Sequence, residues 1–124
     1  MTVDSLNTVA GRIIGALSTA GLDVHDTQPH APPAGPYVLV TGDGGLNLYE
    51  ALCGTPRRRL HTILVMAVGG AGGTPAATRH TADKARVAID ALPGMRQAGT
   101  GPILTDGPPA DRRHSITLTY QTRA

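Results

Sequence analysis

A chain of 124 residues predicts one domain with one hydrophobic core, and its formal net charge of +2 gives no general electrostatic reason to expect nucleic-acid binding. Cys53 is the single cysteine, which excludes an internal disulfide and a cysteine-based zinc site within one chain. With three tyrosines and no phenylalanine or tryptophan, the core must be built mainly from aliphatic side chains.

The first predicted element is an amphipathic helix that ends at Gly21. Asp4 or Ser5 is suited to cap its start, because a side-chain oxygen there can accept a hydrogen bond from a backbone N–H group that has no partner within the helix. Gly21 suits the left-handed conformation that closes many helices. The apolar residues recur with helical spacing: Leu6, Val9, Ala10, Ile13, Ile14, Leu17 and Ala20.

Three strands are predicted next. Residues 22–27 form a short strand and, after a proline-rich loop at 29–36, residues 36–42 combine β-branched and aromatic side chains. Residues 46–56 fit either a short helical turn or a loop. Residues 60–68 are the most apolar run of the chain and are predicted to be the central strand, covered on both faces.

A glycine-rich break at 69–73 leads into a second predicted helix, residues 74–92. Thr74 is its expected cap and Pro75 fits the first helical position. A loop at 93–102 and a short strand at 102–105 follow. The last strand, residues 114–122, alternates strictly: His114, Ile116, Leu118 and Tyr120 share one face, and Ser115, Thr117, Thr119 and Gln121 share the other.

These elements predict an α+β fold in a single domain, residues 1–124. The expected order is α-β-β-β-α-β-β, with two helices packed on a mostly antiparallel or mixed sheet of four or five strands. No stretch is long enough to cross a membrane and the start lacks a signal-peptide pattern, so a soluble protein made inside the cell is expected.

The glycine run is the most suggestive candidate for a site, because glycines between a strand and a helix often bind phosphate. The dinucleotide pattern places a third small residue where this chain has Pro75, and the nucleotide-triphosphate pattern requires a lysine that Gly73-Thr74-Pro75 lacks. We therefore interpret the run as a flexible strand-to-helix loop. A small nucleotide-binding module remains the less favoured alternative.

Other chemistry is weakly indicated. His25 with Asp23 and Asp26 has the residue types of a metal site, but short polar residues at a strand end are commoner as turn and solvent contacts. Cys53 has no histidine near it in sequence, and Glu50 is the only glutamate, so no pair of carboxylates for acid–base work stands out. We expect no enzyme activity, no catalytic residue, no cofactor and no metal.

Two arginine clusters precede predicted strands. Arg57, Arg58 and Arg59 come before the central strand, and Arg112 and Arg113 come before the last one. A basic cluster on a monomer is usually a solvated loop. In a ring it is multiplied by the subunit number, and these five arginines are therefore candidates for a subunit interface or for a lumen that DNA traverses.

The order of elements and three local patterns resemble a known family. The patterns are Tyr37-Val38-Leu39-Val40 ending a strand, Leu48-Tyr49-Glu50-Ala51-Leu52-Cys53-Gly54-Thr55 leading into the apolar strand, and the alternating strand at the end of the chain. Together they resemble the tail terminator and related head-to-tail connector proteins of long-tailed, siphovirus-type bacteriophages, especially those of actinobacterial hosts. The arginine-rich, lysine-poor composition suits a GC-rich genome of that kind.

The resemblance implies a structural virion protein of the tail or neck, made in the host cytoplasm. Six copies would form a homo-oligomeric ring that caps the head-proximal end of the tail tube and stops its polymerisation. Its partners would be the major tail tube protein and the head–tail connector or stopper proteins. Genomic DNA would pass the lumen without sequence recognition, and no membrane is involved. Loops at 29–36, 42–59 and 94–113 are the expected contacts between subunits; a connector adaptor, a stopper and a tail-tube subunit remain alternatives.

Overall fold

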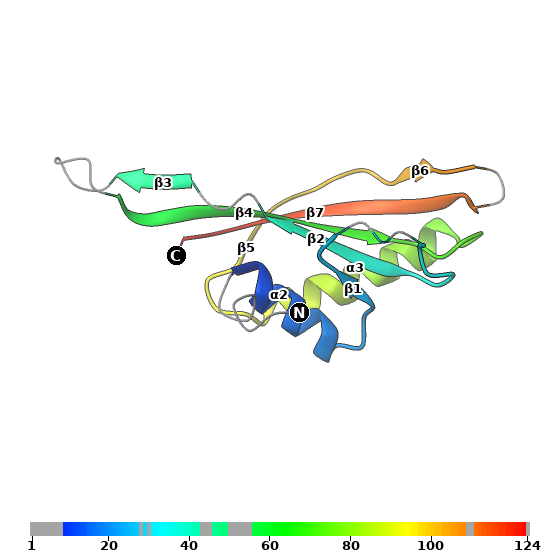
Figure 1. Ribbon diagram of the computed structural model, residues 1–124, viewed down its shortest axis with the longest axis horizontal. Helices are drawn as coiled ribbons and strands as arrows, with labels where there is room; N and C mark the ends of the chain where they lie inside the picture. The colour runs from blue at the N-terminus through cyan, green and yellow to red at the C-terminus, as the bar shows by residue number, and fades with distance from the viewer. Residues whose placement is uncertain are drawn as a thin grey trace.

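The computed structural model describes residues 9–27, 29, 31–42, 46–49, 56–108 and 111–123, in which two helices cover one face of a single sheet (Figure 1). The elements in chain order are α2 (Val9–Thr19), β1 (Val24–His25), β2 (Tyr37–Gly42), β3 (Leu46–Tyr49), β4 (Pro56–Val68), α3 (Pro75–Asp90), β5 (Arg96–Thr100), β6 (Leu104–Asp106) and β7 (Arg113–Arg123). The predicted α+β class and order of elements are confirmed. The described residues form seven strands instead of four or five, because the sequence did not indicate β3 and β5.

The sheet is built around one long antiparallel pair, β4 with β7. Its register runs from Leu60 opposite Arg123 to Val68 opposite Ser115. The path of neighbours is β1-β2-β4-β7-β5, while β3 pairs with the first part of β4 and β6 with the first part of β7. The sheet is mixed, as predicted, since β1 pairs parallel with β2 and the other neighbouring strands of the described residues pair antiparallel.

Two predicted loops contain strands. Residues 46–49, expected to be a helical turn or a loop, are strand β3, and residues 96–100, expected to lie in a loop, are strand β5. Both segments take their strand geometry from a long partner, β4 and β7 respectively. Strand formation there depends on cross-strand neighbours distant in sequence, which local composition does not report. For the same reason β4 begins at Pro56, four residues before the predicted start.

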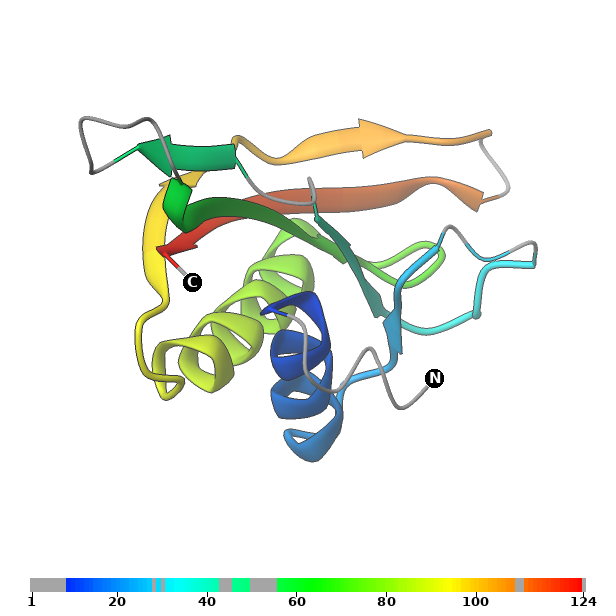
Figure 2. The ribbon, with the colours of Figure 1, turned by 60° about the vertical axis from the view of Figure 1, so that its left-hand side comes forward.

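The core lies between the helices and the face of the sheet that they cover (Figure 2). Alternate residues of the central pair point into it and are buried, as the period-two pattern predicts. From the helices come mainly small and branched side chains, which let α3 lie close to the sheet. The buried hydrophobic residues of this cluster are Val9, Ile13, Ile14, Leu17, Val38, Val40, Ile63, Val65, Ala67, Ala82, Ala85, Ile89, Ile116, Leu118 and Tyr120.

The start of α3 is fixed as the sequence predicts. Thr74 is the cap and its hydroxyl accepts a hydrogen bond from the backbone N–H of Ala77 at 3.1 Å, with Pro75 in the first turn. Thr78 and Thr81 are buried although they are polar. Their hydroxyls donate to backbone carbonyls one turn earlier, so neither is left without a partner in the core.

Tyr120 is the largest fully buried side chain of the described residues. Burial raises the pKa of Tyr120 to about 12 from an ordinary value of 10.0, and the nearby Asp90 carboxylate adds to the rise. The folded state therefore holds the phenol proton more tightly than the unfolded state does. Its contribution to stability is complete below pH 10 and is lost as the pH rises from about 10 through 12.

Replacing Tyr120 by Phe keeps the ring in the core and removes the hydroxyl group that titrates. We expect the free energy of unfolding of the wild type to fall more between pH 9 and pH 11.5 than that of Tyr120→Phe, because the variant has no phenol to titrate there. Urea unfolding at both pH values measures the difference. An equal fall in the two proteins would show that the phenol of Tyr120 does not titrate differently in the folded and unfolded states.

Candidate functional site

The glycine-rich loop after β4 already uses its backbone donors within the chain. The N–H groups of Gly69, Ala71 and Gly72 donate to the carbonyl oxygens of His114, Ala34 and Arg112, at 2.8, 3.1 and 3.3 Å, and Gly73 donates to Gly70 at 3.0 Å. A phosphate cradle needs such groups free to point at an anion. The sequence predicts a flexible loop. In the structure, this loop is hydrogen-bonded to Ala34 of the proline-rich segment and to Arg112 and His114 at the start of β7.

Gly69 is required by close packing. A Cβ atom at this position would lie 2.5 Å from the hydroxyl oxygen of buried Thr78 and 3.3 Å from the carbonyl oxygen of His114. Thr78 is held by its hydrogen bond within α3, and His114 by β7, so neither neighbour can withdraw freely. The first glycine of the run thus lets the start of α3 approach the start of β7.

The change Gly69→Ala should therefore destabilise the fold by about 1–3 kcal/mol, the usual cost of overpacking. Gly99→Ala is the matched control, because a Cβ atom there meets nothing within 4 Å and Gly99 has no positive φ. Chemical denaturation of both variants gives the comparison. Equal stability of Gly69→Ala and Gly99→Ala would mean that the approach of α3 to β7 is not tight.

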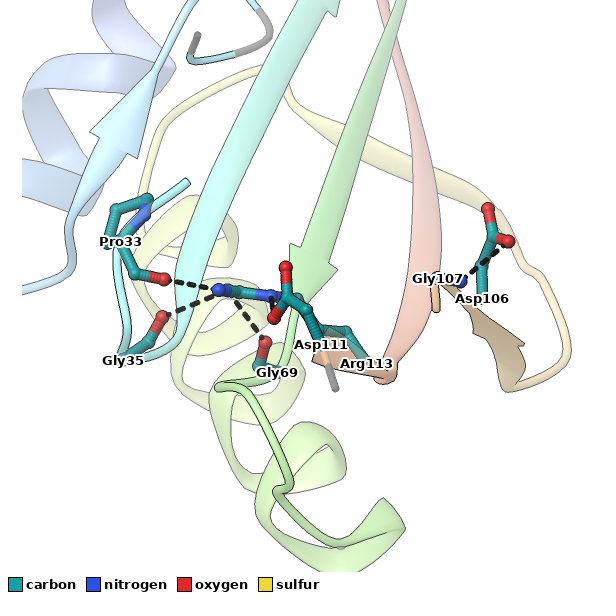
Figure 3. Close-up of polar contacts among 7 residues, drawn as sticks. All are labelled: Pro33, Gly35, Gly69, Asp106, Gly107, Asp111 and Arg113. Atoms are coloured by element: carbon teal, nitrogen blue, oxygen red, sulfur yellow. Dashed lines mark hydrogen bonds and ion pairs between the residues drawn. The ribbon is translucent and has the colours of Figure 1, made fainter. Parts of the chain in front are cut away.

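Arg113, at the start of β7, joins three segments that lie far apart in sequence (Figure 3). Its guanidinium donates to the Asp111 carboxylate at 2.9 Å and to the backbone carbonyls of Pro33, Gly69 and Gly35, at 2.5, 3.4 and 3.5 Å. It also lies over the Tyr37 ring, 5.7 Å from its centroid. The side chain is only 10% exposed, so these contacts inside the chain account for most of its surface.

We expect Arg113→Ala to lower the free energy of unfolding by about 2–4 kcal/mol, because it leaves a half-buried carboxylate and several carbonyls without their donor. The neighbouring Arg112 is exposed, and Arg112→Ala should change stability by less than about 0.5 kcal/mol. Thermal or urea unfolding of the two variants tests this. If Arg113→Ala and Arg112→Ala were equally stable, Arg113 would not have the structural role that we assign to it.

The two arginine clusters do not come together. Because β4 and β7 are antiparallel, Arg57, Arg58 and Arg59 lie at one end of the pair and Arg112 and Arg113 at the other. The triplet lies inside β4 and not in a loop before it: Arg58 is paired with Leu48 of β3 and Arg59 with Asn47. Whether any of these arginines meets a neighbouring subunit or DNA remains a prediction.

The helices leave the other face of the sheet free (Figure 1). At the end where β7 starts, this face carries Asp106 and Arg113, and Tyr37 and Val68 are buried there. Further along β4 and β7, from Met66 to Thr62 and from Ser115 to Gln121, its positions alternate with the buried ones and carry no charge. Leu64 is 43% exposed and Leu104 57% exposed on this face. We name as the open sheet face the uncharged residues Leu39, Thr41, Thr62, Leu64, Met66, Leu104, Ser115, Thr117, Thr119 and Gln121.

The described residues offer little for catalysis or metal binding. They contain no group of three His, Cys, Asp or Glu residues close enough to hold a metal ion. His25 lies 3.2 Å from the Asp23 carboxylate and packs edge-on against Tyr37. Cys53, Glu50 and His30 lie outside the described residues. No helix in the part of the chain that the structure describes is long and apolar enough to span a bilayer.

A cleft beside α3 offers no free catalytic group. It has a volume of about 250 Å³ and lies between α3, the segment from Thr100 to Ile103, and β7. Asp83 and Arg86 on its rim are paired with each other at 3.1 Å, and the floor is apolar. A cleft in which the acid is neutralised by its own helix neighbour has no group free for acid–base chemistry among these residues.

Comparisons with known proteins show a likeness of fold. No family model matches the chain, and no curated protein sequence matches it. A chain in the solved structure of the virion of a native gene transfer agent particle has a similar fold, with a TM-score of 0.53 and 22% sequence identity. The match covers 97% of this chain and 88% of that chain. At this identity the likeness shows a shared fold.

Proposed function

We propose that the chain is a structural virion protein, a ring-forming subunit that caps the head-proximal end of a phage tail tube. The observation that carries the proposal is the fold shared along almost the whole chain with a component of a gene transfer agent virion. The likeness covers 97% of this chain and 88% of the other, so it extends over both helices and the sheet and is not limited to a single motif. The resemblance of the sequence to tail terminators supports the same assignment.

The open sheet face suits a subunit of an assembly. Its residues are uncharged, with Asp106 and Arg113 only at one end, and this matches the composition of an interface core, from which charged residues are depleted. A closed ring needs a heterologous contact, in which one surface of each subunit meets a different surface of the next. We place the open sheet face on one side of this contact.

In this role the protein ends tube polymerisation and presents its other side to the head–tail connector. The partners are further copies of the chain in a ring, proposed to be a hexamer, the major tail tube protein, and a connector or stopper protein. Genomic DNA passes through the lumen without sequence recognition. The location is the tail or neck of the virion, and the role is non-enzymatic.

A connector adaptor, a stopper or a tail-tube subunit is the second candidate function, because the likeness to a chain of a gene transfer agent virion does not distinguish one structural component of a particle from another. An image of the particle with the protein labelled separates these possibilities. A ring at the junction of tube and neck supports the terminator, and label repeated along the tube identifies a tube subunit. A nucleotide-binding module is disfavoured by the donors of the glycine loop, which are bound to backbone carbonyls.

A single charge on the open sheet face tests the interface. We expect Leu64→Asp to abolish the ring while leaving a folded monomer, because a buried unpaired carboxylate at an interface costs several kcal/mol. Val87→Asp is the matched control: Val87 is 69% exposed on α3, on the opposite side of the molecule. Mass measurement by light scattering, with circular dichroism to check folding, gives the answer. Rings from Leu64→Asp, or no rings from the wild type with or without tail tube, would contradict the proposal.

A further inference from the structure

The cleft beside α3, which we name the α3 cleft, combines an aliphatic floor with an unpaired positive charge. The floor is formed by Ala82, Ile103, Ile116 and Leu118. On the rim, Asp83 and Arg86 are paired with each other. Arg79 lies on the same rim, is exposed, and belongs to no ion pair of the described residues. The α3 cleft therefore suits an aliphatic side chain that is accompanied by a carboxylate.

Strand β6 carries such a pair of side chains on the opposite face of the sheet. It lies at the edge, beside β7 (Figure 2). The register places Leu104 opposite Ser115 and Asp106 opposite Arg113, so both residues of β6 point to the free face. Leu104 is 57% exposed. Asp106 is also exposed; its carboxylate accepts the N–H of Gly107 and belongs to no ion pair of the described residues.

We propose that Leu104 of one copy enters the α3 cleft of the next copy in the ring, with the Asp106 carboxylate against Arg79 of that copy. The inference rests on the proposed function, because it names the second side of the contact that the open sheet face begins. An aliphatic anchor that fills a pocket, with a charge pair at the margin, is typical of the strongest contacts in an interface. Leu64 on the same face cannot enter a cleft, because β4 has a neighbouring strand on each side.

The spacing of the two pairs of groups agrees. Leu104 and Asp106 are two residues apart on a strand, which separates them by about 7 Å. On α3, Arg79 and Arg86 lie at the two ends of the cleft rim, about 10 Å apart along the helix axis. The middle of the cleft is thus about 5 Å from Arg79 along this axis, and the long arginine side chain spans the remaining gap. A leucine in the middle of the cleft therefore brings the carboxylate within reach of the guanidinium.

The positions of the two surfaces in the fold make this contact heterologous. Leu104 points to the free face, whereas the α3 cleft lies on the face that the helices cover, so the leucine cannot reach the cleft of its own chain. Two copies stacked in this way form the contact once, and one Leu104 and one cleft are left unused at the ends. Each further copy adds in the same manner until the last meets the first, which is how head-to-tail contacts form closed rings.

Reversing either charge tests the pairing. Arg79→Glu would place two carboxylates together in every contact, and Asp106→Arg would place two guanidiniums together. We expect each variant alone to raise the protein concentration at which half of the chains are assembled by at least about tenfold, because like charges that face each other across an interface repel. Arg12→Glu is the matched control, since it makes the same change at an exposed position on α2. Analytical ultracentrifugation measures assembly, and circular dichroism checks folding.

An equimolar mixture of Arg79→Glu and Asp106→Arg gives the sharper result. If the two variants alternate around the ring, opposite charges meet in every contact, and we expect assembly to return close to that of the wild type. A mixture of Arg12→Glu with Asp106→Arg should not recover, because the introduced guanidinium then meets Arg79 in either partner. Failure of the first mixture to recover, or equal recovery of both, would overturn the pairing.

The apolar half of the contact is tested by Leu104→Ser. We expect it to weaken assembly about tenfold or more, as loss of a buried anchor does, and to leave the monomer folded because Leu104 is exposed. Val87→Ser is the matched control: Val87 is 69% exposed on α3 and is not among the residues that line the α3 cleft. Equal assembly of the two variants would contradict the insertion of Leu104.

The two proposals fail in different measurements. If the wild type forms rings and the charge reversals leave them unchanged, the contact between Leu104 and the α3 cleft fails and the proposed function stands. If the wild type forms open chains that the reversals weaken and the mixture restores, the contact stands and the ring that caps a tail tube fails. A wild type that stays monomeric, with or without tail tube, contradicts both.

Discussion

The structure depends on one antiparallel pairing, that of β4 with β7. A strand has a period of two, so the register of this pair decides which residues enter the core and which stay on the open sheet face. A shift by one residue would exchange Leu64 with Val65 and Thr117 with Leu118, and would expose the aliphatic set to water. The same pairing sends the two arginine clusters to opposite ends. The core, the open sheet face and the separation of the two arginine clusters therefore follow from one set of backbone hydrogen bonds.

Arg113 and Gly69 stabilise one end of that pair by opposite means. Arg113 brings a nearly buried charge into contact with carbonyl dipoles of two loops, and its desolvation is offset because the Asp111 carboxylate and these carbonyls replace water around the guanidinium. Gly69 contributes by having no side chain, which lets α3 begin directly beside β7. The proline-rich and glycine-rich segments, which look like loose connections in the sequence, are thus ordered by side chains of the final strand.

The sequence predicted the helices and the central strands because their signals are local. Helical spacing placed the core residues Ile13, Leu17 and Ile89, and strict alternation placed Ile116, Leu118 and Tyr120. It did not predict β5, since Arg96-Gln97-Ala98-Gly99-Thr100 has no strand propensity and becomes a strand only beside β7. Arg113 shows the same limit of sequence-based prediction. Because it is next to Arg112, the sequence suggested a role in contacts with a neighbouring subunit or DNA, and only the fold shows the backbone carbonyls that surround its guanidinium.

The free face of the sheet changes in character along the strands. At the start of β7 the register pairs Asp106 with Arg113, and the Arg113 guanidinium covers the Tyr37 ring. Further along the same strands lie Leu64, Thr117 and Thr119, which carry no charge and are not fully buried. A neutral surface can be covered by protein without desolvating a charge. The middle of the sheet is therefore the part of this face that is best suited to meet another subunit.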